Sequence, residues 1–142
     1  MKWYFETLRK YAVFAGRARR REYWMFELWH ALILVALFVI DIKVSASGHN
    51  QAAVLTGLYL LATALPSLAG LVRRLHDTNH SGWWIFISLV PLVGQFILLR
   101  LLIKDGDPGP NRFGPNPKTE AVAHAPLPEM GYLAPPLPPD RR

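Results

Sequence analysis

The chain of 142 residues contains no cysteine. This absence excludes a disulfide framework, thiolate zinc sites, iron–sulfur clusters and a cysteine nucleophile. The sequence also lacks a phosphate-binding glycine loop with its lysine, a Gly-x-Ser-x-Gly elbow and a His-Glu-x-x-His pair. It therefore offers no catalytic residue, no cofactor site and no metal site, and we expect a protein that is not an enzyme.

Charged residues are scarce in the middle of the chain, where apolar residues dominate. Three apolar stretches lie there, at 24–42, 52–72 and 83–103. Each is close to the roughly 20 residues that cross about 30 Å of hydrocarbon. The second has no charged residue, whereas the first carries Glu27 and Asp41 and the third carries Arg100. This pattern excludes an ordinary soluble globule and predicts an all-α integral membrane helical bundle, with one membrane domain over residues 1–118.

The two ends of the chain differ from this apolar middle. Residues 3–11 have an amphipathic pattern, which predicts a short N-terminal helix in the plane of the membrane interface. Ten of the twelve prolines lie between Pro108 and Pro139. A segment of this composition cannot bury enough apolar surface to become ordered, so residues 119–142 are predicted to form a disordered Pro-rich tail.

Positive charge is unevenly distributed around the apolar stretches. Residues 1–23 contain seven Lys and Arg, and residues 45–51 contain none. Cytoplasmic flanks retain positive charge, so we expect a multi-pass protein of the bacterial inner membrane with its N-terminus in the cytoplasm. Three full crossings would then leave five basic residues of the tail outside, namely Lys104, Arg112, Lys118, Arg141 and Arg142.

The third apolar stretch has Pro91 and Gly94 near its midpoint. Proline removes a helical hydrogen bond and glycine permits a sharp bend. We predict a kinked spanning helix here. The alternative is a re-entrant pair of half-helices, which would return the tail to the cytoplasm but needs protein or water around its backbone.

Three motifs occur in order along the chain. They are FAGRARRREYW at 14–24, RRLHDT at 73–78 with SGWW at 81–84, and GPNRFGPNP at 109–117. Together they resemble the signatures of the small bacterial inner-membrane proteins grouped as domain of unknown function 805 (DUF805). The resemblance implies membership and location but no mechanism, because that family has no established activity. Asn79 and His80 replace a common Gly-Arg, and Phe113 replaces the usual Tyr, which argues against a chemical task at these positions.

The first motif places a basic cluster directly before the first apolar stretch. Near an anionic leaflet each basic residue gains roughly 1 kcal/mol, so we expect contact with anionic lipid, either as simple positive-inside anchoring or as binding of specific head groups. No nucleic-acid recognition motif accompanies the charge, so we expect no nucleic-acid partner. The cluster and the two interfacial aromatic residues after it are Arg17, Arg19, Arg20, Arg21, Tyr23 and Trp24.

Within the first apolar stretch, Glu27, His30 and Asp41 fall on one side of a helix turning 100° per residue. Charged groups in lipid normally face protein or water, so this polar stripe is predicted to face the other helices or a partner subunit. Buried polar packing and a proton or ion relay are both open. Glu27 and His30 also form the half-motif of a carboxylate di-iron site, but the second half is missing.

The central motif contains two possible pairs of side chains. Arg73 and Asp77 are four residues apart and are predicted to pair along one helical face. His76 and His80 have the same spacing, as two zinc ligands would, but lack a third ligand. The residues singled out in this motif are Arg73, Arg74, His76, Asp77, Ser81, Gly82, Trp83 and Trp84.

The closing motif is rich in proline and glycine, which predicts a compact turn rather than a helix or strand. The turn consists of Asn111, Arg112, Phe113 and Gly114. It could fold back onto the membrane surface, or it could meet Asp77 or the basic N-terminal segment, which would favour the re-entrant topology.

These features favour a non-enzymatic membrane protein that acts through helix packing and contact with anionic lipid. We expect it to serve as an accessory subunit, in a homo-oligomer or beside another membrane protein. The alternative function is a small transporter or channel component that uses the polar stripe of Glu27, His30 and Asp41.

Overall fold

The computed structural model describes residues 2–47 and 53–119, and across these ranges it contains four α-helices, one 3-10 helix and no named β-strand. The helices are α1 (Lys2–Arg9), α2 (Arg20–Ala46), α3 (Val54–Asp77), η1 (Gly82–Leu89) and α4 (Val93–Ile103). The prediction of an all-α membrane bundle is confirmed. Residues 120–142 of the predicted disordered tail lie outside the described residues.

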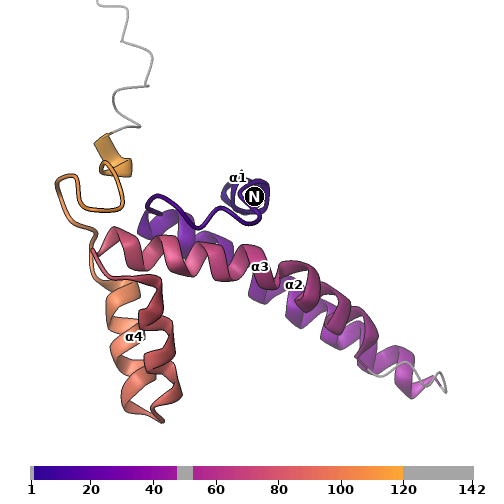
Figure 1. The fold of residues 1–142 in the computed structure, drawn as a ribbon. Coiled ribbons are helices and arrows are strands. Elements are labelled where there is room, and N and C mark those ends of the chain that lie inside the picture. The colour runs from indigo at the N-terminus through magenta and orange to yellow at the C-terminus, as the bar shows by residue number, and fades with distance from the viewer. Residues whose placement is uncertain (1, 48–52, 120–142) are drawn as a thin grey trace, which may run out of the picture.

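Two helices of the described part, α2 and α3, are long and apolar enough to cross a membrane. At 1.5 Å per residue they measure about 40 Å and about 36 Å, more than the ~30 Å of hydrocarbon. Figure 1 shows them side by side as an antiparallel pair. Their outer faces are apolar and open: Val35 is 63% exposed and Leu61 is 76% exposed. Such faces are unfavourable in water and favourable in lipid.

Helix α1 packs against the half of this pair that lies nearer the N-terminus of α2 (Figure 1). The ring of Tyr4 stacks on Phe26 of α2 with 5.4 Å between ring centroids. Its hydroxyl lies 2.9 Å from the hydroxyl of Tyr59 on α3. One aromatic residue thus joins α1 to both long helices.

The third apolar stretch is a hairpin, and the predicted kinked spanning helix is wrong. Helices η1 and α4 pack against each other, and each is about 16 Å long, roughly half of a membrane crossing (Figure 1). The chain reverses at Leu92, which has φ 62° and ψ −65°, and the Val93 N–H donates to the Pro91 carbonyl oxygen at 2.7 Å. This is a γ-turn of the rare positive-φ type, which turns the chain more sharply than a helix kink.

Gly94 is the residue that lets the two halves of the hairpin approach. It is buried, and a β-carbon at this position would overlap the carbonyl oxygen of Ile87 in η1. The need for glycine therefore comes from close contact between backbones. The bend itself is made by Leu92.

We predict that Gly94→Ala destabilises the protein by about 1–3 kcal/mol, because the added methyl group must push η1 and α4 apart. Gly57→Ala is the matched control in α3, where a β-carbon has nothing within 4 Å. Alanine at Gly57 should be neutral or stabilising by up to about 1 kcal/mol, since alanine favours helix. Reversible unfolding of both variants in detergent measures the difference. Equal stability of the two variants would contradict the hairpin contact.

Candidate functional site

Three segments that are distant in sequence meet at the end of the α2–α3 pair opposite the loop that connects these two helices. We call this assembly of residues 16–22, 73–80 and 104–119 the polar cap. It buries five charged residues, each at most 8% exposed: Arg17, Glu22, Arg73, Arg74 and Asp77. Buried charges of this kind are rare unless they are paired, so the cap is where the chain departs most from ordinary helix packing.

The carboxylate of Asp77 is the centre of the polar cap. Arg17 Nε donates to its Oδ1 at 3.0 Å, and Arg74 Nη1 donates to its Oδ2 at 2.5 Å. The side chains of all three residues are almost completely buried, with exposures of 1%, 0% and 4% for Arg17, Arg74 and Asp77. Buried ions need such charge-assisted hydrogen bonds to offset the loss of water.

The two arginines direct other N–H groups to backbone carbonyls at the end of α4 and in the segment after it. Arg17 donates to the carbonyl oxygens of Asp107 and Gly109, both at 2.7 Å. Arg74 Nε donates to the carbonyl oxygen of Leu102 at 3.0 Å, and Nη2 reaches that of Lys104. Carbonyls at a helix end have no partner within the helix, so Arg74 caps α4.

Backbone contacts complete the junction. The Asp107 N–H donates to the Asp77 carbonyl oxygen at 2.9 Å, and the Ala18 N–H donates to the Arg73 carbonyl oxygen at 3.0 Å. A β-carbon on Gly106 would overlap the Asp77 carboxylate. Position 106 must therefore lack a side chain for the loop after α4 to reach α3.

A second ion pair joins α3 to the start of α2. Arg73 Nη1 lies 3.2 Å from Glu22 Oε1, and Lys10 Nζ lies 3.6 Å from the same oxygen. The predicted pairing of Arg73 with Asp77 is wrong. Arg74, one residue further along α3, holds Asp77 instead, while Arg73 faces the carboxylate on α2.

The turn at 111–114 folds onto α3. Asn111 and Gly114 exchange backbone hydrogen bonds of 3.0 Å, and the Asn111 side chain donates to the His76 carbonyl oxygen at 2.9 Å. The ring of Phe113 stacks on His76 with 3.7 Å between ring centroids. His76 Nδ1 in turn lies 3.2 Å from the carbonyl oxygen of Gly16. The sequence left two positions open for this turn, on the membrane surface or against the other motifs. In the structure the turn lies against the central motif and the basic segment.

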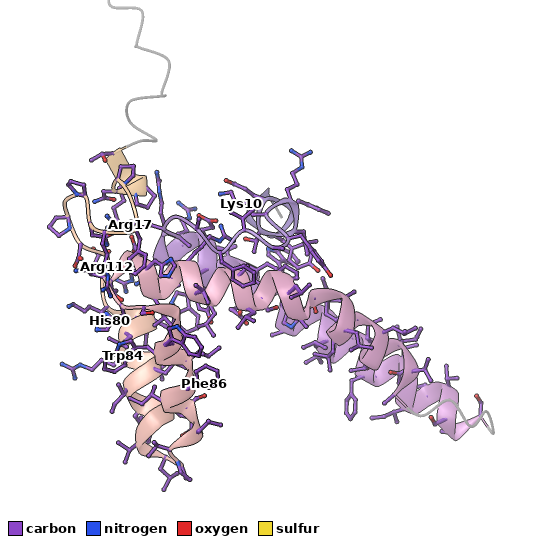
Figure 2. The ribbon with its side chains drawn as sticks, in the orientation of Figure 1. Lys10, Arg17, His80, Trp84, Phe86 and Arg112 are labelled. Atoms are coloured by element: carbon purple, nitrogen blue, oxygen red, sulfur yellow. The ribbon has the colours of Figure 1, made fainter. Side chains whose placement is uncertain are left out.

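Figure 2 shows Arg17 and Arg112 at the cap end of α3, with His80 and Trp84 at the start of the hairpin. Arg112 Nη2 donates to the Asn79 carbonyl oxygen at 3.0 Å. His80 Nδ1 lies 2.6 Å from the Thr78 carbonyl oxygen, so the two histidines of the central motif have separate partners. No group of three potential metal ligands occurs in residues 2–47 or 53–119.

The structure divides the predicted basic cluster. Arg17 is buried in the polar cap and does not have the lipid-facing position that we predicted, because its guanidinium pairs with the carboxylate at the end of α3. Arg19 donates to the carbonyl oxygen of Pro117. The side chains of Arg20 and Arg21 are exposed. Of the two predicted interfacial aromatic residues, Tyr23 is buried and Trp24 is exposed.

The polar stripe of α2 meets α3 at two separate places. His30 Nδ1 lies 3.1 Å from the Tyr59 hydroxyl. Asp41, near the far end of α2, accepts hydrogen bonds from amides in the first turn of α3, including that of Thr56 at 2.9 Å. Within the described ranges no hydrogen bond links Glu27, His30 or Asp41 to another of the three. Asp41 therefore acts as an N-terminal cap for α3.

These features define a small helical membrane protein with a polar cap at one end of its apolar helices. Residues 11–115, which include nearly all of that cap, match the family described as Protein of unknown function (DUF805), and the chain belongs to this family. It is 41% identical to inner membrane protein YhaH of Escherichia coli K12 over 120 residues, 84% of this chain and 99% of YhaH. It is 44% identical to inner membrane protein YhaI of the same strain over 118 residues, 83% and 97% of the two chains.

A more distant likeness is to the uncharacterized protein YiiR of Escherichia coli K12, with 37% identity over 91 residues, 61% of this chain and 58% of YiiR. No solved structure matches the chain. The family predicted from the three motifs is confirmed, and all three motifs contribute residues to the polar cap or to the start of the hairpin beside it.

We predict that Asp77→Asn destabilises the protein by about 3–5 kcal/mol, because it leaves two buried arginines without their common carboxylate. Asp107→Asn is the matched control, since Asp107 contributes backbone groups to the cap. It should change stability by less than about 0.5 kcal/mol. Denaturant unfolding in detergent measures both, and equal losses would show that Asp77 is not the centre of the cap.

Proposed function

We propose that this chain is an inner-membrane protein whose polar cap lies at the cytoplasmic surface and contacts anionic lipid. It acts without enzymatic activity, through helix packing, as an accessory subunit. The observation that supports this most directly is the convergence of three segments in one polar cap at one end of the apolar helices. The names of YhaH and YhaI support the location.

The cap supports an even number of crossings. Arg17, Asp77 and Asp107 are joined by hydrogen bonds, which supports placing the segments before α2, after α3 and after α4 on one side of the membrane. Helices α2 and α3 then cross out and back. The η1–α4 hairpin enters and returns on the cap side, because each of its arms spans only about half of the hydrocarbon.

The hairpin has the surface expected of a re-entrant element. Its tip is apolar and open, with both Leu89 and Leu92 75% exposed. Its backbone is helical in both arms, so its N–H and C=O groups are largely bonded within the hairpin, as hydrocarbon requires. In this topology the basic residues of the loops fall mainly on the cap side, as the positive-inside rule expects, and Lys43 lies at the opposite end of α2.

A non-enzymatic role is supported by the way the cap uses its ionisable groups. The Asp77 carboxylate accepts from two arginines, and Arg17 sends its other N–H groups to carbonyls. Groups held in this way stabilise a structure and are not free to transfer protons or attack a substrate. The transporter alternative gains no comparable support, because Asp41 is engaged in capping α3.

The proposed topology predicts which introduced cysteines an impermeant maleimide reaches. The chain has no cysteine, so each single variant is read without background. Arg9→Cys and Thr119→Cys should be labelled only from the cytoplasmic side, in inverted vesicles. Ser47→Cys, beyond α2, should be labelled only from the opposite side, in intact spheroplasts. Labelling of Thr119→Cys together with Ser47→Cys would contradict the re-entrant hairpin.

Contact with anionic lipid predicts a dependence of stability on lipid charge. Unfolding in nanodiscs should occur at a higher temperature with phosphatidylglycerol than with phosphatidylcholine, because each exposed basic residue near the surface gains roughly 1 kcal/mol. The double change Arg20→Gln and Arg21→Gln should lower this difference by more than the single change Lys43→Gln at the other end of α2. No difference between the two lipids for the unaltered chain would refute the proposed contact.

A further inference from the structure

A cavity of about 400 Å³ lies beside the start of α2, outside the buried ion pairs of the polar cap. The residues that line it come from the start of α2 and from the segment after α4. They are Arg19, Arg20, Arg21, Asp105 and Lys118. Its volume is within the range of about 300–1,000 Å³ typical of small-molecule sites. Four cations and one carboxylate give this lining a net charge of +3, so the cavity favours an anion.

The cations of this cavity differ in how far they are already engaged. The side chains of Arg20 and Arg21 are exposed. Neither guanidinium group forms a hydrogen bond or ion pair with any residue in the described part of the chain, although the charge of Arg20 helps to lower the pKa of the Asp105 carboxyl. Arg19 donates to the carbonyl oxygen of Pro117. This hydrogen bond holds the segment after α4, which lines one side of the cavity, against α2. Lys118 Nζ lies 2.7 Å from Asp105 Oδ1. Two guanidinium groups are thus available to a ligand, and one ammonium group is shared with a carboxylate.

The backbone at the start of α2 adds to this positive potential. Arg19 is the N-cap residue and makes no capping hydrogen bond with its side chain. In the first turn of α2, the first backbone N–H that donates to a carbonyl of the same turn is that of Tyr23, which donates to the Arg19 carbonyl oxygen at 3.1 Å. The preceding amides lie at the positive end of the helix dipole, where anions are stabilised.

A second cavity, of about 220 Å³, lies between the α1–α2 connection and the 111–114 turn. Its cations are already paired: Lys10 and Arg73 with Glu22, and Arg17 with Asp77. An anion there would compete with buried carboxylates. The larger cavity does not have this cost, because its one carboxylate is exposed.

We propose that the 400 Å³ cavity binds the phosphate group of one anionic phospholipid, with Arg20, Arg21 and Lys118 as its cationic ligands. The inference rests on the proposed function, which puts this face at the cytoplasmic leaflet. The position along α2 favours a lipid as the source of the phosphate. Trp24 and Leu28, within two turns of the cavity, are exposed apolar side chains that acyl chains can cover.

The carboxylate of Asp105 distinguishes a phosphate site from a merely structural role, because the two predict opposite changes in binding when its charge is removed. The hydrogen bond from Lys118 holds the pKa of the Asp105 carboxyl below its ordinary value, so this group is ionised at neutral pH. It competes with phosphate for Lys118 and repels it. Removing its charge should therefore strengthen binding, whereas a general disturbance of the cap would weaken it.

The test titrates the full chain, purified in a neutral detergent, with short-chain phosphatidylglycerol. Native mass spectrometry gives the stoichiometry and tryptophan fluorescence gives the affinity. One lipid should bind per chain. Arg20→Gln and Lys118→Gln should each weaken binding about 10-fold or more, as for loss of a charge-assisted hydrogen bond. Arg9→Gln, an equal loss of charge at an exposed position of α1, should leave the affinity unchanged. Asp105→Asn should tighten it by a few fold.

The other results are equally decisive. Inorganic phosphate or glycerol 3-phosphate binding as tightly as the lipid would overturn the lipid as the source and make this a site for soluble phosphate. Equal weakening by Arg9→Gln would overturn the site and leave the dependence on lipid charge in nanodiscs intact. The unfolding temperature in nanodiscs could instead be the same in both lipids while binding in detergent still depends on Arg20. This result would refute the proposed function and leave the cavity as a phosphate site.

Discussion

The structure depends on the carboxylate that Arg17 and Arg74 share. Asp77 ends α3, Arg17 precedes α2, and both arginines also bond to backbone that follows α4. A buried ion is tolerated only when its partners are present and well placed. Each of the three segments therefore needs the other two, and the polar cap joins the α2–α3 pair to the η1–α4 hairpin.

Two different environments account for the rest of the architecture. The α2–α3 pair and the η1–α4 hairpin expose apolar faces that suit hydrocarbon, whereas the cap collects the charges and the irregular backbone. The arms of the second hairpin are less than half as long as α2 and α3, and Leu92 and Gly94 make its reversal possible. In the proposed topology, such a chain keeps the segments before α2 and after α4 on the cap side and places three apolar segments in lipid.

Much of this could be predicted from residue patterns, and the errors have physical causes. Length and apolar content are enough to recognise α2 and α3, because hydrocarbon demands about 20 apolar residues per crossing. The pairing of Arg73 and Asp77 failed because spacing alone cannot say which of two adjacent arginines faces a carboxylate. Arg17 was placed with its basic neighbours because nothing local shows that one of four arginines is buried. Glu22 and Gly106 gave no signal, since their partners are about 50 and 30 residues away in sequence.

The sequence by itself determined that the apolar segments belong in a membrane, that the fold is all-helical, and which family the chain belongs to. These properties depend on composition and local motifs, which need no long-range contact. The tertiary structure alone decided that the third apolar stretch reverses, that the three motifs form one cap, and which arginines remain available at its surface. These outcomes depend on atoms that approach from distant segments, such as the Gly94 contact with Ile87 and the Asp77 pair with Arg17. Neither periodicity nor the distribution of charge along the sequence indicates which distant residues come into contact.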